Sequence, residues 1–292
     1  MNTKLYFILF FVACQSLMAV VPKSEKNALI DLYNSTAGEN WNQKWDLNKP
    51  VSTWHGLIIE KGNVIAIHLM DNNLVGELPA SIGNLTKLRE LEVAFNKLKG
   101  NIPSSICQLK RLEVLRFGKN KFSGTIPGEI VNLRKLKVLD LFYNQLSGEL
   151  PQHMENFQEI EIISISDNSL SGKLPSGIGE LKKLKRLEIS HNKIEGDIPE
   201  SFSNLKNLKS LDLAANNFEG NFPSSIFSLP NLKIVQIQSN NFNEKYIKNS
   251  IPTATSVVML DYENKEKHFS NPNESIFLDS EIRTADTKFE DE

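Results

Sequence analysis

The sequence predicts an α/β solenoid, a curved horseshoe or superhelix with a parallel β-sheet on its concave face and irregular or 3-10 turns on its convex face. Three residue types recur along the chain with one shared period of 24 residues. Each period also contains a short segment in which apolar and polar residues alternate. A unit of this size cannot bury its own apolar edge, so repetition at a fixed period indicates coils that stack on one another.

Glycine, asparagine and proline carry the repeat through seven consecutive copies. The glycines are Gly76, Gly100, Gly124, Gly148, Gly172, Gly196 and Gly220. Four residues before them stand Asn72, Asn96, Asn120, Asn144, Asn168, Asn192 and Asn216. Three residues after them stand Pro79, Pro103, Pro127, Pro151, Pro175, Pro199 and Pro223. Asn240 keeps the phase once more, but Glu244 occupies the next glycine position, so the array is predicted to end there.

The copy that begins at Leu85, LTKLRELEVAFNKLKGNIP, illustrates the chemistry of one coil. Alternation around Leu91 and Val93 predicts a short, half-buried strand. Asn96 is expected to turn the chain inward, because its amide can donate to and accept from backbone groups that a tight bend leaves unpaired. Gly100 supplies a backbone conformation that other residues avoid. Each coil should therefore contain a strand, an asparagine-stabilised bend and a returning turn.

The pattern L-x-x-L-x-L-x-x-N-x-L-x-G-x-I-P resembles the leucine-rich repeat, in the 24-residue variety of plant receptor ectodomains. The resemblance covers residues 64–243, about eight coils. It implies a second short strand in each coil. It also implies a recognition protein that binds a peptide, protein or glycan on the concave face and is rarely catalytic.

Residues 20–63 resemble the N-terminal cap of such arrays. Ser24 is expected to cap a helix whose apolar face includes Leu29 and Leu32. All three tryptophans of the chain follow, and large aromatic side chains can seal the open end of a core; they are Trp41, Trp45 and Trp54. The plant cap carries the pattern C-x-W-x-G-V-x-C, whereas residues 52–59 are STWHGLII. Both cysteines are absent, so no disulfide can stabilise this cap.

The two ends of the chain have different compositions. Residues 1–19 combine one lysine, an apolar run and small residues, which predicts a secretory signal peptide cleaved after Ala19. The alternative is a lipoprotein anchored through Cys14. A secreted or cell-surface location follows from either. Residues 244–292 are expected to add a capping edge strand within 256–264 and then an acidic tail, which is loosely docked or serves as an interaction segment.

Composition and motifs restrict the function classes. The net charge of −2 and the isoelectric point near 6.3 do not indicate a general polyanion binder, and no basic block predicts nucleic-acid binding. No metalloprotease, phosphate-loop, nucleophile-elbow or C-x-x-C motif is present, so we expect no enzyme activity and no cofactor. Ser190 and His191 are adjacent in a strand and should point apart. The scattered histidines predict no metal site, and Cys107 is expected to be a buried apolar residue.

Candidate ligand-binding residues follow from the phase of the repeat on the concave face. Phe95, Phe142 and Tyr143 are expected to be exposed, with Arg116 and Lys119 between them, which is typical of a binding hot spot. An acidic band is expected on the same face, with His191 nearby; its members are Glu92, Asp140, Glu188 and Asp212. This combination favours a ligand with apolar and cationic or hydroxyl-rich character. The alternative is an ordinary solvated strand face on which the aromatic rings lean against neighbouring coils.

Two functional hypotheses remain at this point. The first is an extracellular recognition module for a protein, peptide or glycan, with an inhibitor of a secreted hydrolase as a special case. The second is a structural or adhesive cell-surface spacer without a discrete site. Substitution of concave-face residues separates them, because only a localised site loses binding.

Overall fold

The computed structural model describes residues 20–252 and 255–262; the predicted signal peptide with Cys14, and the acidic tail from residue 263 onward, lie outside the described residues. Within the described part, one sheet contains ten strands. In spatial order they are β1 (Leu57–Glu60), β2 (Asn63–His68), β4 (Glu90–Glu92), β6 (Val114–Arg116), β8 (Val138–Asp140), β10 (Ile162–Ser164), β12 (Arg186–Glu188), β14 (Ser210–Asp212), β16 (Ile234–Gln236) and β18 (Met259–Asp261). β1 pairs antiparallel with β2, and each later pair in the sheet is parallel.

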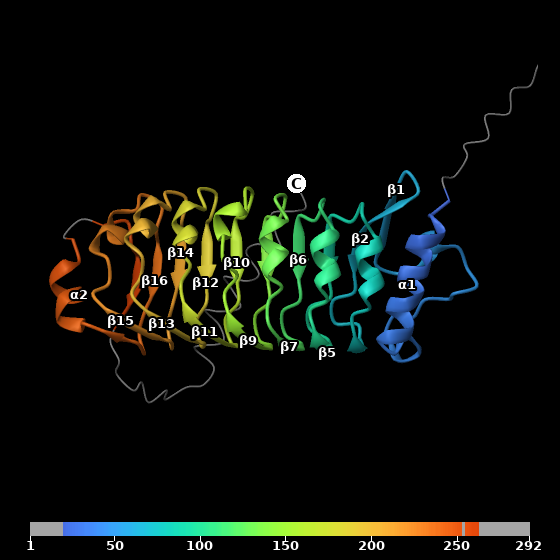
Figure 1. The fold of residues 1–292 in the computed structure, drawn as a ribbon, viewed down its shortest axis with the longest axis horizontal. Coiled ribbons are helices and arrows are strands. Elements are labelled where there is room, and N and C mark those ends of the chain that lie inside the picture. The colour runs from blue at the N-terminus through green and yellow to red at the C-terminus, as the bar shows by residue number, and fades with distance from the viewer. Residues whose placement is uncertain (1–19, 253–254, 263–292) are drawn as a thin grey trace, which may run out of the picture. The chain divides into compact units, whose positions relative to one another are not determined.

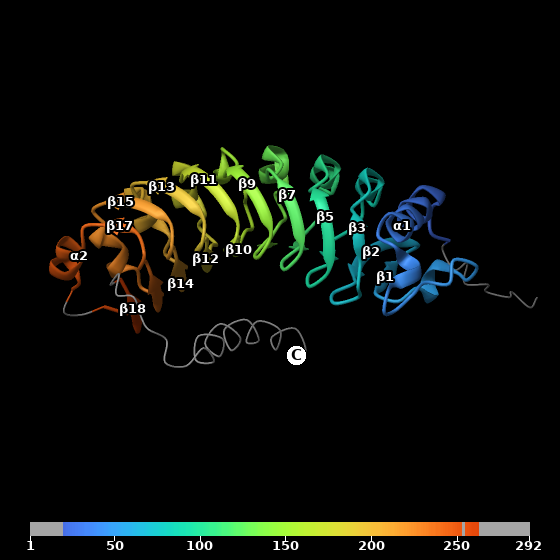
Figure 2. The ribbon, with the colours of Figure 1, turned by 90° about the horizontal axis from the view of Figure 1, so that it is seen from below.

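A second parallel sheet of eight strands in the described residues confirms the expected extra strand in each coil. Its strands are β3 (Val75–Glu77), β5 (Lys97–Asn101), β7 (Lys121–Gly124), β9 (Gln145–Glu149), β11 (Ser169–Lys173), β13 (Lys193–Gly196), β15 (Asn217–Gly220) and β17 (Asn241–Phe242). Figure 1 shows the two sets of strands side by side along the array. In Figure 2 the strands of the first sheet line the inner side of the arc of coils, so we call that sheet the concave sheet.

Short 3-10 helices return the chain between the two sheets, as the predicted convex turns require. They are Ala80–Asn84, Ser104–Gln108, Gly128–Asn132, Met154–Asn156, Ser176–Glu180, Glu200–Asn204 and Ser224–Ser228. In most coils the repeat proline directly precedes this helix, where its fixed backbone angle is tolerated and no helical N–H is lost. The expected solenoid architecture is confirmed.

The repeat asparagines form a continuous ladder through the array. Asn144 is representative: its Nδ2 donates to the carbonyl oxygens of Phe117, Leu141 and Phe142 at 3.0–3.1 Å. Its Oδ1 accepts from the N–H of Phe122 at 2.9 Å. One side chain therefore satisfies backbone groups of its own coil and of the preceding coil, which is why asparagine recurs at this bend.

The core is one apolar cluster that runs through every described coil. Leu91, Val93, Leu98 and Ile106 of one coil are completely buried. The repeat glycine that follows takes a left-handed backbone conformation, with φ of 75° at Gly100, which a side chain would strain. Because each coil rests on its neighbours, the apolar edge of a coil is buried only when the next one is present.

The N-terminal end is sealed by aromatic rings, as predicted. Ring centroids of Trp41 and Trp45 lie 4.8 Å apart, and those of Trp45 and Trp54 lie 4.9 Å apart. Each indole N–H donates to a backbone carbonyl, so the buried rings leave no unpaired donor. The helix α1 (Lys23–Ser35) covers this cluster, but the expectation that Ser24 caps it was wrong. The helix begins one residue earlier, so Ser24 lies inside its first turn and Pro22 occupies the N-cap position.

Short elements complete both ends of the described array. Single-turn 3-10 helices at Gly38–Asn40 and Val51–Thr53 complete the N-terminal cap. At the other end, α2 (Glu244–Ser250) begins at the residue that replaces the repeat glycine, and β18 pairs with β16 as the expected edge strand. None of the helices in the described residues is both long and apolar enough to cross a membrane.

Candidate ligand-binding face

Each concave strand presents its last side chain and the following bend to the inner side of the array. Strand ends lie in register, so His68, Glu92, Arg116 and Asp140 are successive neighbours along one row. The residue before each ladder asparagine has a left-handed backbone, with φ of 58° at Phe95. Non-glycine residues adopt this region seldom. Here the next asparagine holds it, together with the bend residue's own N–H, which donates to a carbonyl oxygen of the neighbouring coil.

This bend lifts one side chain per coil out of the sheet, and two of these side chains are large and aromatic. Phe95 is 42% exposed and Tyr143 is 57% exposed. Between them, Lys119 places its Nζ 5.2 Å from the centre of the Phe95 ring, a cation–π contact. The three residues occupy equivalent positions in consecutive coils, with φ of 58°, 54° and 51°. Phe95, Lys119 and Tyr143, which we call the aromatic row, form an exposed strip beside the ends of β4, β6 and β8.

Phe142 does not belong to the exposed strip, so the expectation that it is an open contact residue was wrong. It is only 6% exposed, and its ring lies edge-on to Phe95 with 6.0 Å between centroids. Gly118 makes this position possible, because a Cβ at residue 118 would lie 2.3 Å from the Phe142 ring. The ring fills the space that glycine leaves in the neighbouring coil and supports Phe95 from below.

Arg116 and Glu92 form an ion pair within the concave sheet. Arg116 Nη1 lies 2.6 Å from Glu92 Oε1, and the two side chains are only 18% and 15% exposed. Both groups were expected to face a ligand separately. The structure instead joins them, so their charges largely compensate each other at the base of the aromatic row.

The other carboxylates of the predicted acidic band are also engaged by neighbours. Asp140 Oδ1 accepts from the N–H of Phe142 at 3.3 Å. Asp212 accepts from Ser190 Oγ at 2.6 Å and from the N–H of Ala214 at 3.1 Å. Glu188 Oε1 lies 3.6 Å from Arg186 Nε. The band exists as a set of positions, but its charges are partly satisfied by the sheet itself.

Ser190 and His191 point apart, as expected from their adjacency. Ser190 is buried and hydrogen bonds to Ser166 Oγ at 3.0 Å, whereas His191 is exposed with Nδ1 4.0 Å from Asp167 Oδ1. The serine hydroxyl therefore has no contact with the imidazole that could activate it. His191 and Glu188 belong to the coil of β12, two coils beyond Tyr143, so the aromatic row and this part of the face are separate.

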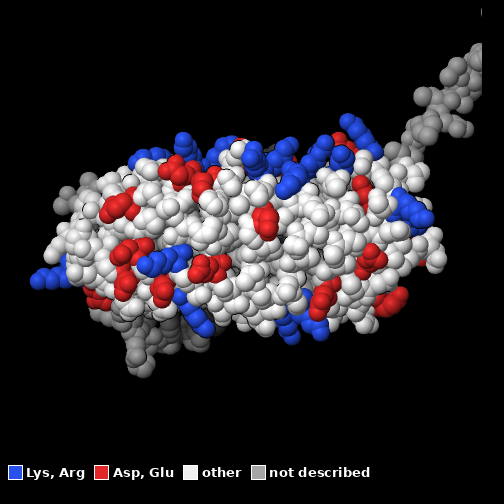
Figure 3. Space-filling model, viewed as in Figure 1, with Lys and Arg blue, Asp and Glu red and all other residues white. Residues whose placement is uncertain are grey.

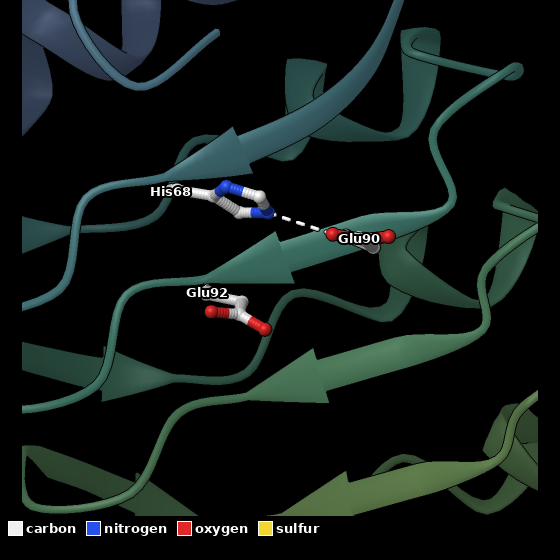
Figure 4. Close-up of side chains that lie close together, drawn as sticks. All are labelled: His68, Glu90 and Glu92. Carbon is white, nitrogen blue, oxygen red and sulfur yellow. Dashed lines mark hydrogen bonds and ion pairs between the residues drawn. The ribbon is translucent and has the colours of Figure 1, made fainter. Parts of the chain in front are cut away.

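One grouping on this face was missed by sequence reasoning. His68, Glu90 and Glu92 each offer an atom within 4.8 Å of the others, and all three are partly exposed. His68 Nε2 lies 2.7 Å from Glu90 Oε2, and Figure 4 shows this bond. Glu92 lies at the end of the same strand as Glu90. The spacing could have revealed this grouping, because His68 and Glu92 stand one 24-residue repeat apart and are therefore neighbours on adjacent strands. Imidazole and carboxylate suit Zn²⁺, yet here Glu90 already holds the imidazole and Glu92 is paired with Arg116.

Two family models match the chain. A leucine-rich repeat region model matches residues 124–257, and a leucine rich repeat model matches residues 86–146. Together they span the coils that carry the asparagine ladder from Asn96 to Asn240.

Solved structures of plant proteins share the fold. The Arabidopsis receptor kinase HAESA, solved in complex with the peptide hormone IDA and the co-receptor SERK1, is 35% identical, with a TM-score of 0.58. The match covers 60% of this chain and 29% of HAESA. A TDR receptor is 38% identical over 57% of this chain and 29% of its own, with a TM-score of 0.56. A plant ice-binding protein shares the fold at 24% identity, covering 76% of this chain and 80% of its own, with a TM-score of 0.60. This chain thus spans less than a third of the matched HAESA and TDR chains.

Proposed function

Because the chain belongs to the leucine-rich repeat proteins, we propose that it is a non-catalytic, extracellular recognition module that binds a peptide or protein segment on its concave face. HAESA was solved with a bound peptide hormone, which supports a peptide as the ligand class. The observation that carries the proposal is the aromatic row. Exposed aromatic groups beside a cation are enriched where binding energy concentrates.

The geometry of the aromatic row favours a particular kind of contact. Phe95 and Tyr143 lie two coils apart, and coils repeat at about 4.8 Å, the spacing of paired strands. The two rings are therefore about 10 Å apart, so an extended peptide laid along the array would meet both. Lys119, held over Phe95, adds a positive charge suited to a carboxylate or a backbone carbonyl of that peptide. The Arg116–Glu92 pair below them offers both donor and acceptor atoms at the floor.

The test measures how tightly the wild type and two variants bind a panel of secreted peptides, secreted proteins and wall glycans. Each variant lacks exposed aromatic rings from a different part of the molecule. The double substitution Phe95→Ala/Tyr143→Ala should weaken binding by about 30-fold or more, as removal of hot-spot aromatics does. Tyr246→Ala is the matched control, because Tyr246 is an exposed aromatic residue in α2, away from the concave sheet. Equal affinity for the wild type and the double variant would move the site elsewhere.

Two other functions make different predictions in the same experiment. A structural or adhesive spacer would bind no member of the panel, or would bind with an affinity that no concave-face substitution alters. An inhibitor of a secreted hydrolase would bind one enzyme of the panel and suppress its activity, with loss of both effects in the double variant. A glycan ligand would retain the aromatic requirement, since sugar rings also stack on exposed aromatic faces.

A further inference from the structure

Basic side chains gather along the edge of the array that precedes the concave strands. Figure 3 shows Lys and Arg in a row along the upper edge of the molecule. The residues between the 3-10 helices and the next concave strands supply them, except in the coil of β10, where residues 157–161 contain no cation. Together we call them the basic edge: Lys87, Arg89, Lys110, Arg111, Arg134, Lys135, Lys137, Lys182, Lys183, Lys185, Lys206, Lys209 and Lys233.

The backbone stacks these positions directly on one another. The N–H of Lys137 donates to the carbonyl oxygen of Glu113 at 2.8 Å, and the same bond recurs from coil to coil. It joins Lys209 to Lys185 at 2.7 Å and Lys233 to Lys209 at 2.8 Å. In this column cations adjoin cations only at Lys185, Lys209 and Lys233, about 4.8 Å apart like neighbouring strands, whereas Lys137 lies between Glu113 and Glu161. The alternating charges stabilise the stack through the Lys137–Glu113 and Lys185–Glu161 ion pairs. Like charges placed opposite each other destabilise a sheet, so stability does not explain the run of Lys185, Lys209 and Lys233.

Carboxylates compensate only part of the charge. Glu113, Glu159 and Glu161 are the acidic residues within these edge segments, and each pairs with one lysine of the following coil at 2.5–2.7 Å. In the part of the chain that the structure describes, other edge cations have no carboxylate within ion-pair distance. They are Lys87, Lys110, Arg111, Arg134, Lys135, Lys182, Lys206, Lys209 and Lys233; Arg89 pairs with Glu60. A surplus of positive charge therefore remains, although the chain as a whole has a net charge of −2.

An open groove of about 780 Å³ lies in the middle of the basic edge. Lys110, Arg134 and Lys135 line it without a carboxylate partner in the described residues, and Lys137 lines it while paired with Glu113. Asn132 and Gln158 add side-chain amides, and Glu113 and Glu159 also line the groove, each paired with a lysine. The groove thus combines several cations with groups that both donate and accept hydrogen bonds.

We propose that the basic edge binds an acidic polysaccharide, with its carboxylate or sulfate groups on the stacked cations and one sugar unit in the groove. A polymer with many negative charges matches an edge that carries a surplus of cations. The amides of Asn132 and Gln158 suit sugar hydroxyl groups, which donate and accept. This surface is separate from the concave face, so the proposal stands independently of the peptide site.

The composition of the edge favours this partner over two others. Exposed large apolar residues in the described part are Val20, Ile58, Met70, Val75, Phe95, Tyr143, Tyr246 and Val258. Among these, Val258 continues the basic edge at its end, where its N–H donates to the carbonyl oxygen of Lys233 at 2.8 Å. Single-stranded nucleic acids bind through aromatic stacking in addition to charge. Membrane-surface segments insert apolar side chains beside their cations. Around the groove, the edge offers charge and amides without exposed aromatic or large apolar side chains.

The experiment measures binding of the chain to immobilised polygalacturonate and to dextran sulfate, which distinguish carboxylate from sulfate recognition. Methyl-esterified polygalacturonate and plain dextran are the neutral forms of the same polymers. The variant Arg134→Glu/Lys135→Glu reverses the charge of two groove residues. The new carboxylates lie beside Lys110 and Arg111 of the preceding coil, where ion pairs with these cations support folding. The matched control is Lys99→Glu/Lys121→Glu, two exposed lysines in register on β5 and β7 of the second sheet.

The proposal expects binding to at least one charged polymer, none to its neutral form, and weakening as salt rises. The groove variant should bind about ten-fold more weakly or worse, whereas the control variant should bind like the wild type. Equal weakening of both variants would reveal net charge rather than a site and would overturn the proposal. Absence of binding to both polymers would do the same. Stronger binding to single-stranded DNA or to vesicles containing phosphatidylglycerol would replace the polysaccharide with that partner.

Discussion

Arg116 and Glu92 are joined across the concave sheet, with Arg116 Nη1 2.6 Å from Glu92 Oε1. The two residues stand at equivalent positions on neighbouring strands, because Arg116 is the register partner of Glu92. Their low exposure means that water screens the pair less than it screens a surface ion pair. The pair therefore contributes to the stability of the coil stack and also shapes the floor of the proposed peptide site.

Substitution of Arg116 by alanine should lower the free energy of unfolding by about 1–2 kcal/mol, since a partly buried Glu92 carboxylate loses its charged donor. Urea denaturation measures this. Arg89→Ala is the matched control, because its pair with Glu60 lies at 3.2 Å with both side chains 43% exposed. That control should change little. If both variants lose the same stability, the Arg116 pair has no special role in the fold.

Removal of one ladder asparagine should be more damaging than removal of a surface asparagine. Asn144→Ala deletes hydrogen bonds to the carbonyls of Phe117, Leu141 and Phe142, and leaves the N–H of Phe122 without its acceptor. We expect a loss of about 1–3 kcal/mol in unfolding free energy. The exposed Asn221→Ala is the control. A denaturation midpoint for Asn144→Ala equal to that of the control would contradict the ladder.

Glu25 should make stability depend on pH in the mildly acidic range. Its buried carboxylate accepts from the N–H of Val64 at 2.8 Å. Burial raises the pKa of Glu25, outweighing the opposing effects of that hydrogen bond and of the Lys87 charge. The protonated form is thus favoured by folding, so its contribution is complete below the unfolded pKa and is lost as pH rises through the folded pKa.

The variant Glu25→Gln retains an acceptor for Val64 but has no proton to lose. The wild type should therefore lose stability relative to Glu25→Gln as pH rises from about 4 to 6, near the ordinary range of a glutamate. Unfolding free energies across that range measure the difference. The control Asp31→Asn changes an exposed carboxylate on the same helix. Parallel pH profiles for wild type and Glu25→Gln would refute the buried-carboxylate assignment.

Cys107 should be chemically inert while the chain is folded. Burial raises the pKa of the Cys107 thiol to about 11, so little thiolate exists near neutral pH. Alkylation by iodoacetamide at pH 8, followed at the Cys107 peptide by mass spectrometry, should be about a hundred-fold slower than in the urea-unfolded chain. Comparable rates in the two states would show that this part of the core opens readily.

Several features of the fold could be predicted because they are local to one coil and then repeated. Asn96 and Gly100 mark a bend that any single copy requires, and the alternation around Leu91 indicates a strand without knowledge of its neighbours. The sealing of the cap by Trp41, Trp45 and Trp54 was predictable for a similar reason, since an open apolar end must be covered. The start of α1 was misplaced because the helix begins at Lys23, directly after Pro22 at the N-cap position, so Ser24 lies inside the first turn.

The candidate site was only partly predictable. The exposure of Phe95 and Tyr143 followed from the phase of the repeat, but the burial of Phe142 depended on Gly118 in the neighbouring coil. The compensation of Glu92 by Arg116 likewise needed the register between strands. Phase assigns a residue to a face, whereas its exposure depends on the side chain that the adjacent coil places beside it.

The sequence by itself determined the period, the asparagine ladder, the ends of the array and the residues available to the concave face. The tertiary structure alone decided which charges remain unpaired. Lys110 and Arg134 are separated by a full repeat in the sequence, and the near-neutral net charge conceals them. Stacking brings such residues about 4.8 Å apart, because every coil advances by one strand spacing. Lysines and arginines that are spread along the sequence thus come together as a basic edge only after the coils are stacked.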